Sequence, residues 1–379
     1  MHRNALIVLI AALLTACTIG KPVPPTPSAL PPTATPVPIN APVVTSPALT
    51  TIHMLDANNG WGISDTAVLR TSDGGSTWYD LSPAKAGQLG YGVASMFLDQ
   101  QHAWVLAPDP NDMLKGTLYI TSDGGASWQS IAVPFGGGDM RFLDAKNGWM
   151  MAGLGAGAGS MGVAVFQTDD GGATWKQAYT NDPNQPDSAS SLPLGGLKDG
   201  ISPADMMNAW VGGVTYTPGV IYLYKTGDGG ISWQQATVKP PDGYDQAELE
   251  TRGPIFAAPE MAYLPVNVSS QNGVMLAVYV SRDGGKSWLV TPTLIPQGGA
   301  TDFVSAKDGF VWNGADFYVT HDGAQTWSTV TPDVAFGSNF GGMDFVDPRT
   351  GFVLTSDASG ARGLYKTTDG GGTWNALGK

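Results

Sequence analysis

The chain is short of several residue types on which common kinds of protein chemistry depend. It has a single cysteine, Cys17, among 379 residues, so it cannot form an internal disulfide. Only three of its 32 acidic residues are Glu, and its four His residues are dispersed without the spacing of metal ligands. With 19 basic residues the net charge is −13, which disfavours nucleic-acid binding. We therefore expect no metal, no cofactor and no nucleic-acid partner.

A six-residue motif, which we call the Asp motif, occurs seven times. It consists of Asp, two small residues, a spacer, Ser or Thr, and Trp. A repeat with a period of about 20–50 residues predicts an array of equivalent structural units. The first residues of the seven copies are Asp73, Asp123, Asp170, Asp228, Asp283, Asp322 and Asp369.

Each Asp motif has the composition of a tight turn between two strands. The carboxylate can accept hydrogen bonds from turn amides, and the glycines tolerate the positive φ that such turns need. The Trp then opens the next strand and supplies a large packing surface. Ala324 replaces the second glycine in one copy. We interpret the seven Asp residues as structural, not catalytic.

A second pattern precedes each Asp motif and completes the repeat. An apolar residue is followed seven positions later by an aromatic one, as in Phe97/Trp104 and Phe142/Trp149. This spacing predicts a strand, a short turn and a second strand. Each repeat then contains four strands, A to D, with the Asp motif between C and D. The sequence therefore predicts an all-β fold, a seven-bladed β-propeller of four-stranded antiparallel blades over residues 50–379.

The two patterns together resemble the Asp-box, or BNR, repeat of the sialidase-type propeller superfamily. The pairing of Ser/Thr-x-Asp-Gly-Gly-x-Thr-Trp with Phe-x-Asp-x-x-x-Gly-Trp is most similar to the photosystem II stability/assembly factor family. The resemblance covers residues 50–379 and implies a non-catalytic scaffold that binds a protein or peptide. Because function depends on sites added to a fold, the superfamily also leaves a glycoside hydrolase or glycan-binding protein open.

The N-terminal residues predict export and lipid attachment. A short apolar run over 5–14 follows Arg3 and ends in Leu-Thr-Ala-Cys, which resembles the lipobox of bacterial lipoproteins. We therefore expect a signal peptide over 1–16, acylation of Cys17 and a Pro/Thr-rich tether over 17–49. The expected location is the bacterial cell envelope, on the extracytoplasmic side of a membrane. Residues 43–49 are also candidates for adding a strand to the last blade.

In such a propeller the Asp motifs and the A–B turns share one face, which we call the motif face. The longer connections gather on the opposite loop face, which is where we expect a ligand. Its most polar segment, residues 240–252, carries two of the three Glu residues and is either a ligand loop or a short surface helix. The ligand-binding candidates are Tyr244, Asp245, Arg252, Arg141, Phe336 and Phe340.

Two roles remain open for these residues. Tyr244, Glu248, Glu250 and Arg252 are the catalytic candidates if the chain is a glycoside hydrolase, since a Tyr beside a Glu or a pair of carboxylates suits that reaction. Phe336 and Phe340 are either exposed anchors for a partner or buried against a neighbouring blade. Asp182, Asn184 and Asp187 gather oxygens in one loop but lack the Gly and the bidentate Glu of an EF-hand.

Overall fold

Regular structure in this protein is almost entirely β. The computed structural model describes residues 40–84, 89, 93–185 and 187–378, and a 3-10 turn, η1 (Gly337–Asn339), is their only helical element. None of these residues belongs to a helix long and apolar enough to cross a membrane. Cys17 and most of the expected tether lie outside the described residues.

Successive groups of four antiparallel strands, which we call blades, account for 28 of the 30 described strands. The strands of blades 1 to 4 are β2 (Leu49–Met54), β3 (Gly60–Ser64), β4 (Val68–Thr71) and β5 (Trp78–Asp80); β6 (Ala94–Phe97), β7 (Ala103–Asp109), β8 (Asp112–Thr121) and β9 (Gln129–Val133); β10 (Gly138–Phe142), β11 (Gly148–Gly157), β12 (Ser160–Thr168) and β13 (Lys176–Thr180); β14 (Leu197–Pro203), β15 (Ala209–Val214), β16 (Leu223–Thr226) and β17 (Gln234–Gln235).

Blades 5 to 7 follow the same plan. Their strands are β19 (Ile255–Ala258), β20 (Met261–Ser270), β21 (Gly273–Ser281) and β22 (Leu289–Pro296); β23 (Thr301–Phe303), β24 (Gly309–Trp312), β25 (Phe317–Thr320) and β26 (Ser328–Val330); β27 (Phe340–Phe345), β28 (Gly351–Ser356), β29 (Arg362–Thr367) and β30 (Asn375–Leu377). Two further strands, β1 (Val43–Val44) and β18 (Glu248–Glu250), lie outside the fourfold pattern. β18 joins blades 4 and 5 into one nine-stranded sheet.

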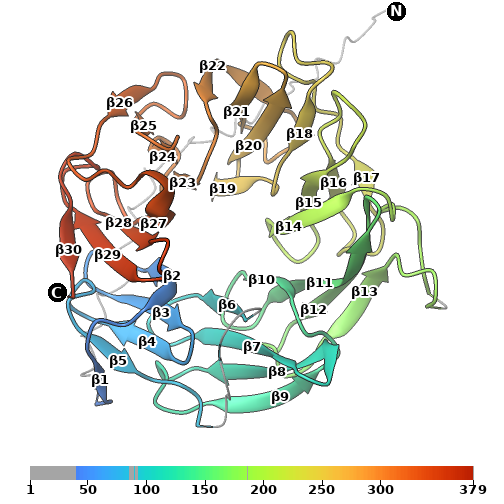
Figure 1. The fold of residues 1–379 in the computed structure, drawn as a ribbon. Coiled ribbons are helices and arrows are strands. Elements are labelled where there is room, and N and C mark those ends of the chain that lie inside the picture. The colour runs from blue at the N-terminus through green and yellow to red at the C-terminus, as the bar shows by residue number, and fades with distance from the viewer. Residues whose placement is uncertain (1–39, 85–88, 90–92, 186, 379) are drawn as a thin grey trace, which may run out of the picture. The chain divides into compact units, whose positions relative to one another are not determined.

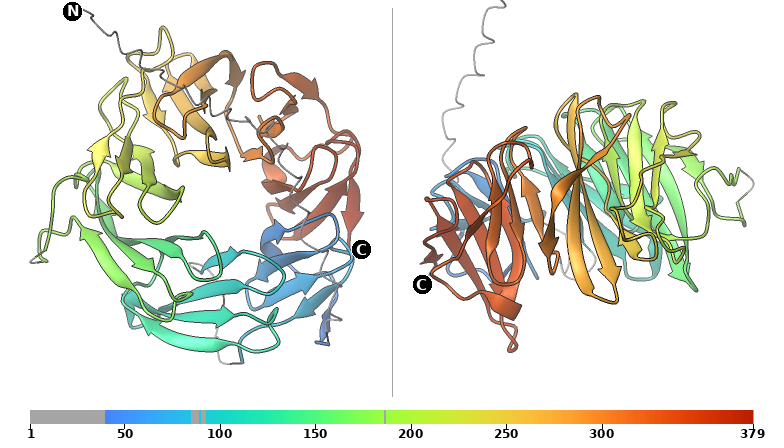
Figure 2. Two further views of the ribbon diagram at one scale, coloured as in Figure 1. Left: turned by 180° about the vertical axis from the view of Figure 1, so that it is seen from behind. Right: turned by 90° about the horizontal axis from the view of Figure 1, so that it is seen from above.

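The blades are arranged in a ring with the first strand of each innermost, and we call the centre of the ring the channel (Figure 1). The edge-on view shows the long strands running from one face of the ring to the other (Figure 2, right). The predicted all-β propeller of four-stranded antiparallel blades is confirmed.

The hydrophobic core is divided among clusters that each lie between two neighbouring blades. The cluster between blades 2 and 3, for example, joins Trp104 and Leu118 to Phe142 and Phe166. Within it the rings of Trp104 and Phe142 stack with their centroids 3.6 Å apart. The same stacking recurs between later blades, where Tyr263 meets Phe303 at 3.9 Å and Phe310 meets Phe345 at 3.6 Å. The paired apolar and aromatic positions of the repeat are therefore the contacts that hold successive blades together.

The Asp motif closes through one hydroxyl and one carboxylate. Thr121, two residues before Asp123, donates its hydroxyl to Asp123 Oδ1 at 2.8 Å and accepts the Gly125 N–H at 2.9 Å. Asp123 Oδ1 also accepts the Ser127 N–H at 2.9 Å. Such bonds keep the carboxylates ionised. In the fifth copy, for example, hydrogen bonds led by that from the Ser287 hydroxyl lower the pKa of Asp283 to about 2. These bonds are those of a self-contained turn, and Ala324 accommodates a φ of +66°.

Each Asp motif also docks on the A–B turn of its own blade. Gly124 donates its N–H to the Gln101 carbonyl at 2.9 Å, and Gly171 donates to the Lys146 carbonyl at 2.8 Å. The backbones approach so closely here that a side chain at position 124 would clash with the Gln100 carbonyl oxygen, 2.9 Å from its Cβ. The same bond forms in all seven blades, from Gly74, Gly124, Gly171, Gly229, Gly284, Gly323 and Gly370.

The ring closes by side-chain packing between blades 1 and 7. Leu49, Met54 and Trp78 share a cluster with Phe352 and Leu364 of the last blade. Lys366 Nζ donates to the Ala57 carbonyl at 2.7 Å across the same junction. The expectation that residues 43–49 extend the last blade is wrong, because β1 pairs with β5 and Leu49 already begins the innermost strand of blade 1.

Replacing Thr121 with Val should lower the free energy of unfolding by about 1–3 kcal/mol, since it leaves the buried Gly125 N–H without an acceptor. Urea denaturation followed by tryptophan fluorescence measures the change. Thr121→Ser keeps the hydroxyl and should stay within about 1 kcal/mol of wild type. A Val variant as stable as wild type would show that this hydroxyl does not hold the turn.

Candidate functional site

A recess of about 650 Å³, which we call the channel cleft, opens on the channel wall where blades 3 to 6 meet. A smaller recess of about 220 Å³ adjoins it and contains Asp139, Lys198 and Asp199. Both recesses are lined by Arg141 and Arg252, so the structure brings together two of the predicted ligand-binding residues from separate blades. The channel cleft is lined by Arg141, Ser202, Arg252, Ile255, Asn267 and Thr301, among others.

Arg252 is displayed by a break in the innermost strand of blade 5. β18 and β19 both pair with β20, and the link between them is unpaired. At this link Thr251 N donates to the Gly213 carbonyl at 3.1 Å. Gly253 has a φ of +106°, and a Cβ on Gly212 would lie 2.3 Å from Gly253 N. Only glycines permit this close approach of two blades, which leaves the Arg252 side chain exposed beside the cleft.

The two arginines differ in their partners. Arg141 Nε lies 3.0 Å from Asp139 Oδ1, and Asp139 Oδ2 accepts the Ile201 N–H of the next blade at 2.9 Å. Within the part of the chain that the structure describes, Arg252 makes no ion pair. Its guanidinium can therefore donate hydrogen bonds to a carboxylate of a ligand without first breaking an ion pair.

Two buried groups beside the arginines were not predicted from the sequence. Asp199 has a buried oxygen with no hydrogen-bond partner, and burial, followed by the nearby charge of Glu250, raises its pKa. Lys198 is 3% exposed and donates to four backbone carbonyls, including Leu194 O at 2.9 Å and Gly196 O at 2.9 Å. Lys198 thus binds the loop before blade 4, whereas Asp199 has an unused hydrogen-bond acceptor in the smaller recess.

A second polar group on the channel wall links blades 6, 7 and 1. Asp302 Oδ2 accepts the Phe345 N–H at 2.6 Å, and Asp344 accepts the Met54 N–H. Burial, together with the charge of Asp344, raises the pKa of Asp302 to about 7, and burial raises the pKa of Asp344 to about 6. Each carboxylate joins the innermost strands of two blades, so the pair has a structural role.

The Tyr–Glu arrangement considered for glycoside hydrolysis is not formed. Residues 248–250 are a strand, not a helix, and Leu249 is buried while Glu248 and Glu250 are exposed on the other side. Tyr244 packs in the cluster that contains Leu249. Because alternate residues of a strand face opposite ways, Tyr244 lies on the side away from both Glu residues. Glu250 alone joins Arg252 at the channel cleft.

The remaining predicted ligand residues lie apart from the channel cleft. Phe336 is 2% exposed and packs edge-on against Trp312 and Trp374, so it cannot serve as an exposed anchor. Phe340 is partly buried and stacks on Trp312 with centroids 5.0 Å apart. Burial against the neighbouring blade is therefore the outcome for both. Asp245 is exposed in the turn before β18 and does not line the cleft.

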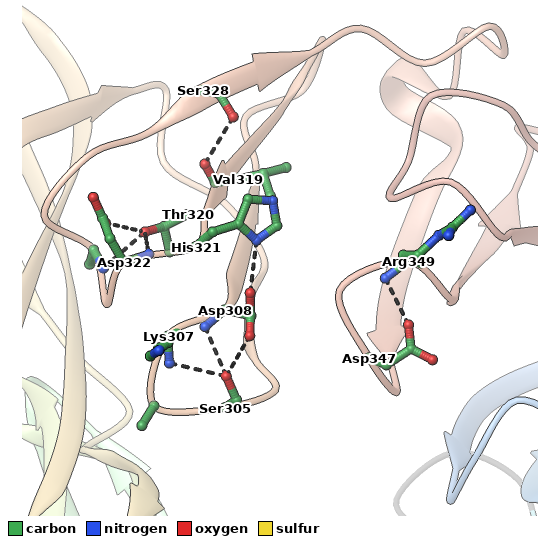
Figure 3. Close-up of polar contacts among 12 residues, drawn as sticks. Ser305, Lys307, Asp308, Val319, Thr320, His321, Asp322, Ser328, Asp347 and Arg349 are labelled. Carbon is green, nitrogen blue, oxygen red and sulfur yellow. Dashed lines mark hydrogen bonds and ion pairs between the residues drawn. The ribbon is translucent and has the colours of Figure 1, made fainter.

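A Ser, an Asp and a His meet on the motif face of blade 6, but not in the order of a hydrolytic triad. Asp308 accepts the Ser305 hydroxyl at 2.7 Å and contacts His321 Nδ1 at 2.8 Å (Figure 3). A triad needs the His between the other two. Ser305 Oγ also accepts the Lys307 N–H at 3.0 Å, so the group stabilises its turn. Asp182 likewise accepts the Asn184 N–H within its own turn. No cluster of residues that could bind a metal occurs among the described residues.

No protein-family model matches the chain. Its sequence is 24% identical over 283 residues to the photosystem II assembly lipoprotein Ycf48 of Synechococcus sp. (strain CC9902), covering 64% of this chain and 74% of that protein. A structure of Ycf48 bound to a D1 peptide matches with a TM-score of 0.54 and 18% identity over 86% of this chain and 96% of that one. The GH74 xyloglucanase of Xanthomonas campestris matches with a TM-score of 0.59 and 14% identity over 88% of this chain and 55% of that one. These structural likenesses show the fold.

The Asp302 carboxyl should make the protein less stable as pH rises from about 4 to about 7. Its folded-state pKa lies above the ordinary value near 3.9, so the folded state binds the proton more tightly and loses this advantage on deprotonation. Asp302→Asn keeps an acceptor for the Phe345 N–H and removes the titration. Thermal unfolding at several pH values should therefore show a smaller loss of stability over this range for the variant. Equal pH dependence in both proteins would contradict the assignment.

Proposed function

We propose that this chain is a lipid-anchored, extracytoplasmic scaffold that binds a peptide segment of another protein in the channel cleft without catalysing a reaction. In this it would act like the photosystem II stability/assembly factors. Its similarity in sequence to an assembly lipoprotein supports this proposal, as does its similarity in fold to Ycf48, a protein solved with a bound peptide.

The observation that carries the proposal is the pair of arginines at the channel cleft. In a chain of net charge −13, Arg141 and Arg252 come from different blades to line the same recess. Arg252 is free of ion pairs within the described residues, and an arginine fork binds a carboxylate in two parallel hydrogen bonds. The cleft also presents Ile255 and Asn267, so it can hold an apolar side chain beside a peptide amide.

A carbohydrate-active protein is the second candidate, and the position of Glu250 favours it. Glu250 lines the same cleft as Arg252, and Glu248 lies two residues away on the same side of β18. The Cα atoms of residues i and i+2 of a strand are about 6.6 Å apart. Carboxylates carried on the same side of a strand at this backbone spacing can reach the separation that inverting glycosidases use. Against it, Tyr244 is on the other side of the strand.

Replacing both arginines, as in Arg141→Met/Arg252→Met, should reduce capture of the partner from solubilised native membranes by roughly 10-fold or more, because interface arginines are frequent hot spots. Quantitative mass spectrometry of the captured proteins measures this. The matched control, Lys307→Met/Arg349→Met, removes two positive charges from the motif face and should leave capture unchanged.

An equal loss in both variants would argue against a site in the channel cleft. A panel of glycosides, including xyloglucan oligosaccharides, is assayed with the same proteins. Hydrolysis that disappears in Glu250→Gln would replace the scaffold by a glycosidase.

The membrane attachment rests on the sequence around Cys17. The lipobox-like Leu-Thr-Ala-Cys would carry the lipid, and the Pro/Thr-rich residues between Cys17 and β1 would place the ring away from the lipid surface. Cys17→Ser removes the thiol that would carry the lipid, so the protein should move from the membrane to the soluble fraction. Fractionation and immunoblotting measure this, with Thr18→Ser as the control. Membrane retention of the Cys17 variant would contradict the lipid anchor.

A further inference from the structure

The junction between blades 4 and 5 lacks a hydrogen bond that other junctions make on the motif face. Trp61 Nε1 donates to the Asp99 carbonyl of the next blade at 2.9 Å, and Trp149 Nε1 donates to the Asp205 carbonyl at 3.1 Å. Trp210 holds the same place in blade 4 and is 5% exposed, yet its indole N–H has no acceptor. The junction between blades 4 and 5 therefore lacks this hydrogen bond, which forms between blades 1 and 2 and between blades 3 and 4.

A second inter-blade bond is missing at the same junction. Three residues before the Asp of the motif, Gln167 donates to the Met206 carbonyl of the next blade at 2.7 Å. Lys366 donates in the same way to the Ala57 carbonyl at 2.7 Å. Lys225 occupies this position in blade 4, but its side chain makes no ion pair or hydrogen bond within the described residues. Its ammonium group is left at the mouth of the junction.

The cause lies in the A–B turn of blade 5. In the other blades this turn starts with Asp or Ser, as at Asp99, which accepts the N–H groups of Gln101 and His102 at 2.7 Å each. Blade 5 has Ala258 there, so no side-chain oxygen can form the turn. The chain instead pairs Ala258 with Met261 and closes tightly at Pro259 and Glu260. Consequently no backbone carbonyl of this turn accepts the Trp210 indole N–H.

The result is a cleft of about 790 Å³ on the motif face, which we call the junction cleft. It is lined by Trp210 and by three cationic residues, Lys225, Arg282 and Lys286. None of the three forms an ion pair in the described part of the chain, and Arg282 contacts the Met261 sulfur at 3.9 Å. This concentration of unpaired cations is notable in a protein of net charge −13.

Three of the four acidic residues that line the junction cleft are engaged by their own turns, and the fourth, Glu260, makes no ion pair in the described part of the chain. Asp228 accepts the Ser232 hydroxyl and N–H, and Asp283 accepts those of Ser287. Asp205 accepts two N–H groups of its turn. The three engaged carboxylates have few remaining lone pairs, and Glu260 pairs with none of the three cations in the described residues, so the cations are available to a ligand.

We propose that the junction cleft is a second binding site, which takes an acidic peptide segment. Its size is typical of a ligand pocket. Arg282 can hold one carboxylate in a bidentate manner, and Lys225 and Lys286 can each pair with another. It opens on the motif face, whereas the recess beside the channel cleft is lined by the loop-face ends of blade 3 strands at Gly138, Gly153 and Met161. The two sites can therefore be occupied by different segments at once.

The test uses a fluorescein-labelled octa-glutamate peptide and the full-length protein in detergent, with binding followed by fluorescence anisotropy. At 150 mM salt the Debye length is about 8 Å, so the charges elsewhere on the chain are largely screened. The variant Lys225→Met/Arg282→Met/Lys286→Met should weaken binding by roughly 10-fold or more. The matched control, Lys146→Met/Lys176→Met/Lys307→Met, removes the same charge outside the junction cleft and should change the affinity less than about 2-fold.

Equal weakening by the two triple variants would overturn the site, because it would show an effect of net charge alone. Failure of the octa-glutamate peptide to bind, including the case in which inorganic phosphate binds instead, would overturn the acidic-peptide assignment. Binding that is lost in Arg141→Met/Arg252→Met and kept in the junction-cleft variant would also overturn it. This last arm separates failure of the second site from failure of the proposed channel site.

Discussion

The structure depends on the packing of each blade against the next. A four-stranded sheet with two apolar faces cannot remain in water, so both faces must be covered by neighbours. Stacked aromatic pairs such as Trp104 and Phe142 supply this cover, each worth about 0.5–1.5 kcal/mol beyond its buried area. Because the last face must also be covered, the chain has to return to its start. The cluster of Met54 with Phe352 shows that it does so.

Both proposed sites lie where the repeat is interrupted. The broken strand of blade 5 displays Arg252 beside the channel, and the altered turn at Ala258 opens the junction beneath Trp210. At the junctions of blade 1 with 2 and of blade 3 with 4, the corresponding carbonyl and indole N–H are paired between blades and are not available to a ligand. In a structure built from repeats, an interruption is therefore informative, since a missing internal contact leaves a donor for an external one.

The sequence predicted the repeated parts of the fold because each copy carries its own turn chemistry. Asp123 and the glycines after it specify their turn locally, and Phe142 with Trp149 marks a strand, a turn and a strand. It did not predict β18 or the strand break beside Arg252, because these depend on the close approach of Gly212 to Gly253 from different blades. The sequence also did not reveal the raised pKa values of Asp199 and Asp302, since these result from burial by segments that are distant in the sequence. Whether Phe336 is exposed or buried was left open for the same reason.

The placement of β1 has a mechanical consequence. A pull from the N-terminal side reaches β1 first, and β1 is held on β5 by only two residue pairs. Next along the path are the Arg362 bond to the Ala48 carbonyl and the cluster around Leu49, both of which belong to the junction of blades 1 and 7. Tension is thus delivered to the seam of the ring. Blades 4 and 5 lie on the far side (Figure 1), so a ligand there would be held by the part of the ring that carries the load last.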